Sequence, residues 1–167
     1  MKTIDLTQRK VALVDDEDFE LLSRWKWYAL RDHATLSFYA VRHTKATEGQ
    51  KMVHMHRVIL GLEYGDKRLG DHINRDTLDN RRRNLRIATP AENCWNRGKQ
   101  SNNKSGFKGV CYYKRSAKWV ARIMCAGKVV TLGYFATPEE GHAAYCEAAK
   151  KFHGEFASVA PREQESL

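Results

Sequence analysis

The stretch DHINRDTLDNRRRNLR, residues 71–86, decides how this chain is organised. Its sixteen residues include three carboxylates, one imidazole, three amides and five arginines, but only three apolar side chains. Burial of apolar surface is the dominant favourable contribution to folding, so this segment cannot fold on its own content. The sequence therefore predicts that the rest of the chain holds this polar loop in place.

The positive charge of the chain lies in its centre and its C-terminal half. The 167 residues carry a formal net charge of +9. Residues 1–50 hold eight Lys and Arg against eight acids, residues 51–97 hold ten against six, and residues 98–157 hold ten against four; the remaining tail is slightly acidic. This length suggests one ordinary domain or two small ones. The charge balance predicts a polyanionic partner.

The cysteine spacing and the hydropathy pattern argue against a structural zinc site and against a membrane-spanning protein. None of the four cysteines forms a Cys-x-x-Cys pair, so the spacing does not favour a structural zinc site. With no signal peptide, we expect free thiols and a cytoplasmic location. Apolar runs stay well short of the roughly 20 residues of a membrane span, so no membrane partner is expected. We expect a monomer.

The first 60 residues predict a region rich in β-strands. Residues 10–14 read as a strand, and the acids at 15–18 either bind a metal or, in the favoured interpretation, begin a helix at its positive end. Residues 25–30 and 38–42 show the alternating pattern of strands, and the polar stretch between them predicts a hairpin. Their aromatic side chains could stack on bases, but packing in a core is the favoured interpretation. Residues 52–60 read as a strand, or as a strand leading into a short helix. His54 and His56 would share one strand face, as a metal pair or as support for a neighbouring site.

After a loop at residues 61–70, the order across residues 70–97 is strand end, arginine-rich loop, strand and helix. Residues 85–89 form the second strand. Thr89, Pro90 and Glu92 are typical of a capped helix start. That places Asn93 in the first turn of a helix that ends near Gly98.

Residues 106–157 predict a compact unit of three antiparallel strands and one helix. The strands are expected at 107–113, 118–123 and 128–135. A helix start at Thr137 repeats the signal at Thr89, and Gly154 ends the helix. The expected apolar helix face consists of Ala144, Tyr145, Ala148, Ala149 and Phe152. The other sheet face would carry some combination of Lys108, Tyr112, Arg115, Lys118, Arg122 and Lys128, and this basic surface would suit a DNA major groove.

These elements predict an α+β chain with two domains. A nuclease domain would span residues 1–97, with a β-rich part at 1–50 and a core at about 52–97. A linker without apolar side chains would follow at 98–105, then the sheet-and-helix domain at 106–157 and a tail at 158–167.

The polar loop has the groups that phosphodiester hydrolysis needs. Asp71 and His72 would diverge at a strand end, so that one binds a metal while the other faces the attacking water. Oxygen ligands at Asp71 and Asn93 suit Mg²⁺ or Mn²⁺. Asn84 can hydrogen-bond across the loop. The loop arginines would contact DNA phosphates: Arg81, Arg82, Arg83 and Arg86.

At these positions the chain resembles the ββα-metal motif of HNH endonucleases, particularly phage and intron-type homing enzymes. The resemblance implies that His72 is the general base, that Asp71 and Asn93 bind the divalent metal, and that Asn84 is the structural asparagine of the site. His56 matches the opening segment of the family, where a supporting role is usual. Asn93 stands where many members have a second histidine, as in variants that use one metal with Asp and Asn ligands.

The C-terminal unit resembles the APETALA-two/ethylene-response-factor DNA-binding domain of plants. The matching segments are FKGV at 107–110, WVARI at 119–123, LGYF at 132–135, AAY at 143–145 and GEFA at 154–157. The resemblance implies that the sheet enters the major groove and that Lys108, Arg115, Trp119 and Arg122 contact DNA. Tyr112 and Thr131 stand where the plant domains usually have Arg and Trp, so the plant target sequence does not transfer.

Together these observations predict a site-specific, metal-dependent DNA endonuclease or nickase of homing type, from a mobile element or phage. Two alternatives remain at this point. One is a non-catalytic, sequence-specific DNA-binding regulator that retains an HNH fold. The other is an RNA-processing enzyme, although a sheet of this kind suits the major groove of B-form DNA better than the narrow groove of RNA.

Overall fold

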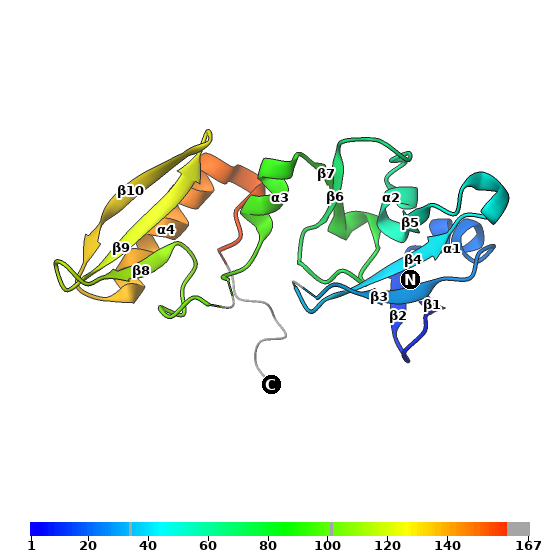
Figure 1. Cartoon of the computed structure of the whole chain (residues 1–167), viewed down its shortest axis with the longest axis horizontal. Coiled ribbons are helices and arrows are strands. Elements are labelled where there is room, and N and C mark those ends of the chain that lie inside the picture. Colours follow the sequence, from blue (N-terminus) through cyan, green and yellow to red (C-terminus); the bar gives the residue numbers. More distant parts are fainter. Residues whose placement is uncertain (34, 101, 160–167) are drawn as a thin grey trace. The chain divides into compact units, whose positions relative to one another are not determined.

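A computed structural model of the chain describes residues 1–33, 35–100 and 102–159 (Figure 1). The chain divides into two compact units, Met1–Ala91 and Glu92–Leu167. Both mix short helices with antiparallel strands, and this confirms the predicted α+β class. Most of the predicted tail, from residue 160 on, lies outside the described residues, and the predicted domain limits stay a prediction.

The first unit begins with a hairpin of β1 (Lys2–Asp5) and β2 (Val11–Val14), followed by helix α1 (Asp16–Leu22). Ala12 and Val14 alternate into the core, where Leu22 joins them. Three acids occupy the first turn of α1, where negative charge is favourable. The strand predicted at 10–14 and the helix predicted from the acidic cluster are therefore both confirmed.

A three-stranded antiparallel sheet follows, in the order β3 (Tyr28–Arg31), β4 (Phe38–His43) and β5 (Met52–His54). The turn η1 (Ala46–Glu48) precedes β5, and α2 (Met55–Ile59) follows it. The strand predicted from residue 25 was wrong in its first half. Trp27 lies before the strand and is buried, as expected of these aromatic side chains, and its indole Nε1 donates a hydrogen bond to the Leu22 carbonyl at 2.9 Å.

Helix α2 changes the expected relation between His54 and His56. Residues 52–60 form a strand that leads into a short helix, which was one of the two readings of this run. His54 is the last residue of β5, whereas His56 lies within α2, so the expectation of a shared strand face was wrong. The two rings nevertheless lie 5.3 Å apart, because the helix turns back beside the strand.

The polar loop lies between β6 (Leu69–His72) and β7 (Leu85–Ala88), which pair antiparallel. The short turn η2 (Arg82–Asn84) leads into β7, and α3 (Pro90–Asn96) comes next. The predicted order of strand, arginine-rich loop, strand and helix is confirmed. Leu85 joins the core of the first unit and anchors the far end of the loop.

The second unit is a sheet in the order β10-β9-β8 with helix α4 on one face (Figure 1). The strands are β8 (Val110–Tyr113), β9 (Lys118–Cys125) and β10 (Lys128–Phe135). Helix α4 (Pro138–His153) starts with the predicted capping box, in which the Thr137 hydroxyl accepts a hydrogen bond from the Glu140 amide. The turn η3 (Gly154–Phe156) follows α4.

The core of this unit lies between β9 and α4, where Ile123 contacts the buried side of the helix. Tyr145, Ala148 and Ala149 of the predicted helix face are buried. Phe152 was wrongly assigned to that face: its side chain is 39% exposed, and His153 is buried one position further on. His153 can enter the core because its Nε2 bonds the Met124 carbonyl at 2.7 Å.

Gly109 explains how the chain enters this sheet. Its backbone adopts φ +75°, a conformation that favours glycine, and a side chain there would collide with the ring of Tyr145. The glycine therefore allows the segment before β8 to pass directly against the helix.

Candidate nuclease site and nucleic-acid interface

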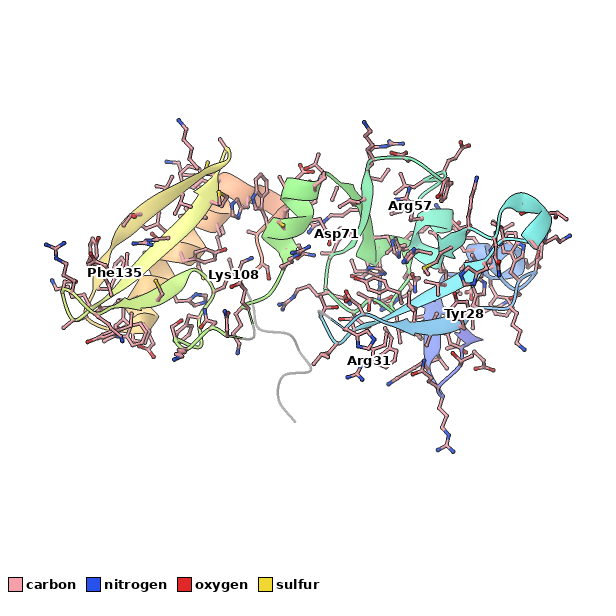
Figure 2. All side chains as sticks on the ribbon, viewed as in Figure 1. Tyr28, Arg31, Arg57, Asp71, Lys108 and Phe135 are labelled. Carbon is pink, nitrogen blue, oxygen red and sulfur yellow. The ribbon has the colours of Figure 1, made fainter. Side chains whose placement is uncertain are left out.

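Asp71 and His72 end strand β6, and both side chains are almost fully buried, at 5% and 4% exposed. Successive side chains of a strand point to opposite faces, so the two diverge. Asp71 is paired in register with Arg86 across the β6–β7 ladder. The Arg86 guanidinium accordingly lies 2.8 Å from Asp71 Oδ2. Figure 2 labels Asp71. Residue His72 is paired with Leu85, on the side of the hydrophobic core.

Asn84, near the end of the polar loop, bonds to residues at its start and in its middle. Its side-chain Nδ2 donates to the Asp79 carbonyl at 2.7 Å, and its side-chain Oδ1 accepts from the Asn74 backbone amide at 2.9 Å. The Ile73 amide also donates to the Asn84 carbonyl at 2.8 Å. One buried asparagine therefore supplies three bonds that close the loop just beyond His72.

The N-terminal region, which carried no motif in the sequence, supports the loop from outside. Leu13 of β2 forms a parallel bridge with Asp79, with bonds of 2.9 Å from the Leu13 amide to the Leu78 carbonyl and 2.8 Å from the Asn80 amide to the Leu13 carbonyl. On another side, the Thr77 hydroxyl donates to the Phe38 carbonyl at 2.7 Å. Hydrogen bonds to the backbone of two N-terminal elements thus hold a loop that has few apolar side chains of its own.

Three of the four arginines proposed to meet phosphates are engaged in ion pairs within the first unit. Arg81 pairs with the buried Asp79 at 2.6 Å, Arg82 with the buried Asp18 at 2.6 Å, and Arg86 with Asp71. Arg83 is exposed and forms no ion pair with any described residue. Holding the loop therefore already occupies most of the arginines, and their contact with DNA stays a prediction.

Burial lowers the pKa of the imidazoles of this site, so they are neutral at neutral pH. Burial lowers the pKa of His72, although the bond to Asn80 and the nearby acids oppose this effect. The pKa of His56 lies well below its ordinary value, because of burial and then the neighbouring His72 and His54. The His56 and His72 rings lie 5.0 Å apart, and Tyr39 lies 6.2 Å from His72. A neutral imidazole is the form that can accept a proton from water.

The donor chemistry at this strand end is compatible with a hard divalent cation. Asp71 offers carboxylate oxygens, and oxygen is the ligand that Mg²⁺ and Mn²⁺ prefer in proteins. Within the described ranges, no three His, Cys, Asp or Glu side chains gather as a metal-holding group. A divalent cation bound here would therefore have few protein ligands, with Asp71 as its carboxylate and waters as most of the others. Asn93, the second proposed ligand, is half-buried on α3.

In the second unit, the strand register sorts the proposed DNA contacts between the two sheet faces. Val110 lies against Gly141 of α4, so its register partner Ala121, and with it Trp119 and Tyr112, share the helix side. Lys118 and Arg122 alternate to the open side. The open side also carries Tyr113 and Tyr134, whose rings lie 5.7 Å apart beside the fully buried Val120.

The remaining basic residues of the second unit differ in their positions and contacts. Arg115 is exposed in the turn between β8 and β9. Lys128 is the first residue of β10, and its pairing with Cys125 places it on the helix side of the sheet. Lys108 has a structural contact: its Nζ donates to the carbonyls of Trp95 and Arg97, each at 2.6 Å (Figure 2). The Trp95 ring stacks on His153 at 4.4 Å. Lys108 therefore ties the end of α3 to this unit, while its DNA contact stays a prediction.

Sequence reasoning missed several residues that build the nuclease site. Asp79 and Asn80 are 2% and 1% exposed, yet a polar run gave no signal of which side chains turn inward. Gly70 has no room for a side chain, since a Cβ there would collide with the His56 ring. Asp18 was noted only as part of an acidic helix start. The helix pattern of α1 could have identified Asp18, because Leu22 shares its buried face four residues later.

Comparison with known protein families finds a match for one segment in each half of the chain. Residues 53–94 match the model of an HNH endonuclease, and residues 105–155 match the model of an AP2 domain. The chain thus carries an HNH endonuclease segment followed by an AP2 domain, as the two resemblances predicted. These matches support a nuclease and DNA-binding function.

Curated relatives cover the chain to different extents. Protein 3.8 of Escherichia phage T7 is 38% identical over 58 residues, which are 35% of this chain and 48% of the phage protein. The AP2-like ethylene-responsive transcription factor TOE2 of Arabidopsis thaliana is 40% identical over 63 residues, 38% of this chain and 13% of the plant protein. An uncharacterized HNH endonuclease, L560, of Acanthamoeba polyphaga mimivirus is 25% identical over 149 residues, 88% of this chain and 73% of the viral protein. The chain therefore spans less than half of the phage and plant relatives.

No solved structure matches the chain. Among the described residues, no helix is both long enough and apolar enough to cross a membrane.

Proposed function

We propose that this protein is a site-specific, divalent-metal-dependent DNA endonuclease of homing type, which nicks or cuts double-stranded DNA. The observation that carries the proposal is the end of β6, where a buried imidazole with a lowered pKa lies next to a buried carboxylate, inside the segment that matches HNH endonucleases. An imidazole that stays neutral at physiological pH is suited to act as a general base.

In the proposed reaction, His72 accepts one proton from the attacking water. The water oxygen forms the new bond to phosphorus, and the bond to the leaving sugar oxygen breaks. That oxygen keeps the electron pair and takes a proton from solvent. Asp71 and Asn93 would hold Mg²⁺ or Mn²⁺, which when bound neutralises charge on the scissile phosphate. Asn84 keeps the loop closed around His72 through its three bonds.

DNA binding is assigned mainly to the second unit. Lys118 and Arg122 on the open sheet face, with the exposed Arg115, form no ion pair with any described residue and so are available to phosphates or base edges. Arg83 of the polar loop is likewise exposed and forms no ion pair with any described residue. Its position just after the site suits a contact with the DNA backbone near the cleaved bond.

The decisive experiment incubates supercoiled plasmid with the full chain and Mg²⁺, with and without EDTA, beside the variant His72→Ala. We expect nicking that EDTA abolishes and that the variant reduces by about 10²- to 10⁴-fold, the usual range for loss of a general base. Lys26→Ala, on a loop outside both matched segments, is the matched control and should nick normally.

Further variants test the metal ligands separately. Asp71→Ala and Asn93→Ala should each reduce Mg²⁺-dependent nicking while DNA binding in gel shifts persists. Equal nicking by wild type and His72→Ala would remove the catalytic assignment. Tight, sequence-specific binding without any metal-dependent nicking would favour the regulator that keeps a nuclease fold.

A further inference from the structure

The side chain of Asn80 lies directly against the imidazole of His72. Its Oδ1 is 3.4 Å from His72 Nε2, and the two side chains are 1% and 4% exposed. Asn80 therefore turns fully inward within a polar loop, and its side-chain oxygen lies within hydrogen-bonding distance of the proposed base.

The orientation of the Asn80 amide follows from its second bond. Its Nδ2 donates to the Leu78 carbonyl at 3.1 Å, and a carbonyl oxygen can only accept. Consequently the oxygen of the amide, not the nitrogen, faces His72. Because that oxygen also only accepts, a neutral His72 must carry its proton on Nε2 and leave Nδ1 as the acceptor.

The backbone of Asn80 is fixed by an element that lies outside both family matches. The Asn80 amide donates to the Leu13 carbonyl at 2.8 Å, and the Leu13 amide donates to the Leu78 carbonyl at 2.9 Å. Both bonds belong to strand β2, whereas the nuclease match begins at residue 53. The N-terminal hairpin thereby sets the position of the segment that contacts the base.

We infer that Asn80, held in place by β2, is a positioning residue that locks His72 in the tautomer with the proton on Nε2 and so directs Nδ1 toward the attacking water. This inference rests on the proposed function for the role of Nδ1, but the tautomer itself is a property of the folded protein. When Nδ1 takes up the proton, the Nε2–H bond to Asn80 persists and stabilises the imidazolium. Without Asn80, the Nε2–H loses this acceptor, so the preference for the tautomer with its proton on Nε2 weakens.

The tautomer can be measured directly by nuclear magnetic resonance of the full chain labelled with ¹⁵N in its histidines. At pH 8, long-range ¹H–¹⁵N correlations distinguish the protonated from the unprotonated ring nitrogen. We expect wild-type His72 to show a protonated Nε2 and an unprotonated Nδ1. In Asn80→Ala the two nitrogens should shift toward the averaged values of a tautomer mixture. The kcat for nicking should fall by about 10- to 100-fold with little change in KM.

Two further variants separate the tautomer lock from general damage to the loop. Asn74→Ala removes another loop amide, one that bonds Asp79 at 3.3 Å and not His72, so the His72 tautomer should stay as in wild type. Asn80→Asp retains an acceptor oxygen and should restore the Nε2–H signal that Asn80→Ala loses. If Asn80→Ala does not fold, a protonated Nδ1 of His72 in wild type or in Asn80→Asp still overturns the inference.

A protonated Nδ1 in wild-type His72 would overturn the inference, as would an unchanged tautomer and unchanged kcat in folded Asn80→Ala. The outcome for the proposed function is separate. If the wild type shows the expected tautomer and loses it in Asn80→Ala, but no preparation nicks DNA with Mg²⁺, the positioning role stands and the nuclease proposal fails.

Discussion

The two units use their basic residues in opposite ways. In the first unit, Arg81, Arg82 and Arg86 pair with acids that are nearly inaccessible to solvent. In the second unit, Arg115, Lys118 and Arg122 are exposed and form no ion pair with any described residue. One set of positive charges therefore holds a polar loop together, whereas the other remains available to a polyanion. Net charge alone does not distinguish these roles, and their removal should have different consequences.

The largest expected effect comes from removing an acid that holds the loop. Asp79 is 2% exposed, and its two oxygens each lie 2.6 Å from a nitrogen of Arg81. These bonds lower the pKa of Asp79 although burial alone would raise it. Asp79→Ala leaves a largely buried guanidinium without its partner and should destabilise the first unit by about 3 kcal/mol.

Urea unfolding followed by amide signals of the first unit measures this loss. The control is Asp66→Ala, which removes an ion pair with Arg68, whose side chain is 59% exposed. Solvent screens that surface pair, so the control should unfold almost as wild type does. Similar midpoints for both variants would show that the buried pairs do not hold the loop.

A smaller loss is expected where the backbone passes against the site. Gly70→Ala would force the His56 ring to move, and such overpacking costs about 2 kcal/mol. The matched control in the second unit is Gly141→Ala, where a Cβ would lie 3.3 Å from Val110. A helical alanine also gains propensity there, so we expect a Tm close to that of wild type. Equal shifts in Tm for the two variants would contradict the close packing at Gly70.

Acid should destabilise the first unit through its buried histidines. The pKa of His56 is lowered in the folded state, so the unfolded chain binds more protons once the pH falls below about 6.5, the ordinary histidine value. Stability is therefore full above that pH and declines below it, by up to about 1.4 kcal/mol per pH unit for one proton. Urea midpoints of wild type and His56→Gln between pH 8 and 5 test this. The variant should show a shallower decline, and an identical slope would exclude His56 as the cause.

The smallest effect in free energy distinguishes the two kinds of arginine most directly. If about six phosphates are contacted, log affinity should fall with log salt at a slope of roughly −5. Arg122→Ala should reduce that slope by about 1, because it removes one phosphate contact. Arg82→Ala should leave the slope nearly unchanged, since its guanidinium pairs with Asp18 at 2.6 Å. Gel shifts across a salt series measure both slopes, and equal reductions would show that the loop arginines also bind DNA.

Sequence reasoning was most successful where the determinants are local. The strand at 128–135, the Thr137 capping box and the order of elements around the polar loop all follow from periodicity and short-range signals. It failed where a distant contact overrides the local pattern. Trp27 leaves the expected strand to reach the Leu22 carbonyl, and His153 replaces Phe152 in the core because Met124 supplies an acceptor.

The sequence by itself determined the α+β class, the nuclease-like loop and the DNA-binding sheet, because spacing, capping and alternation are properties of neighbouring residues. Only the tertiary structure decided which polar side chains of residues 71–86 turn inward. Every side chain in that run is plausible at a surface, and burial depends on acceptors that the chain supplies from afar. Leu13 and Asp18, more than 60 positions upstream of their loop partners Asn80 and Arg82, supply bonds that fix the loop around His72.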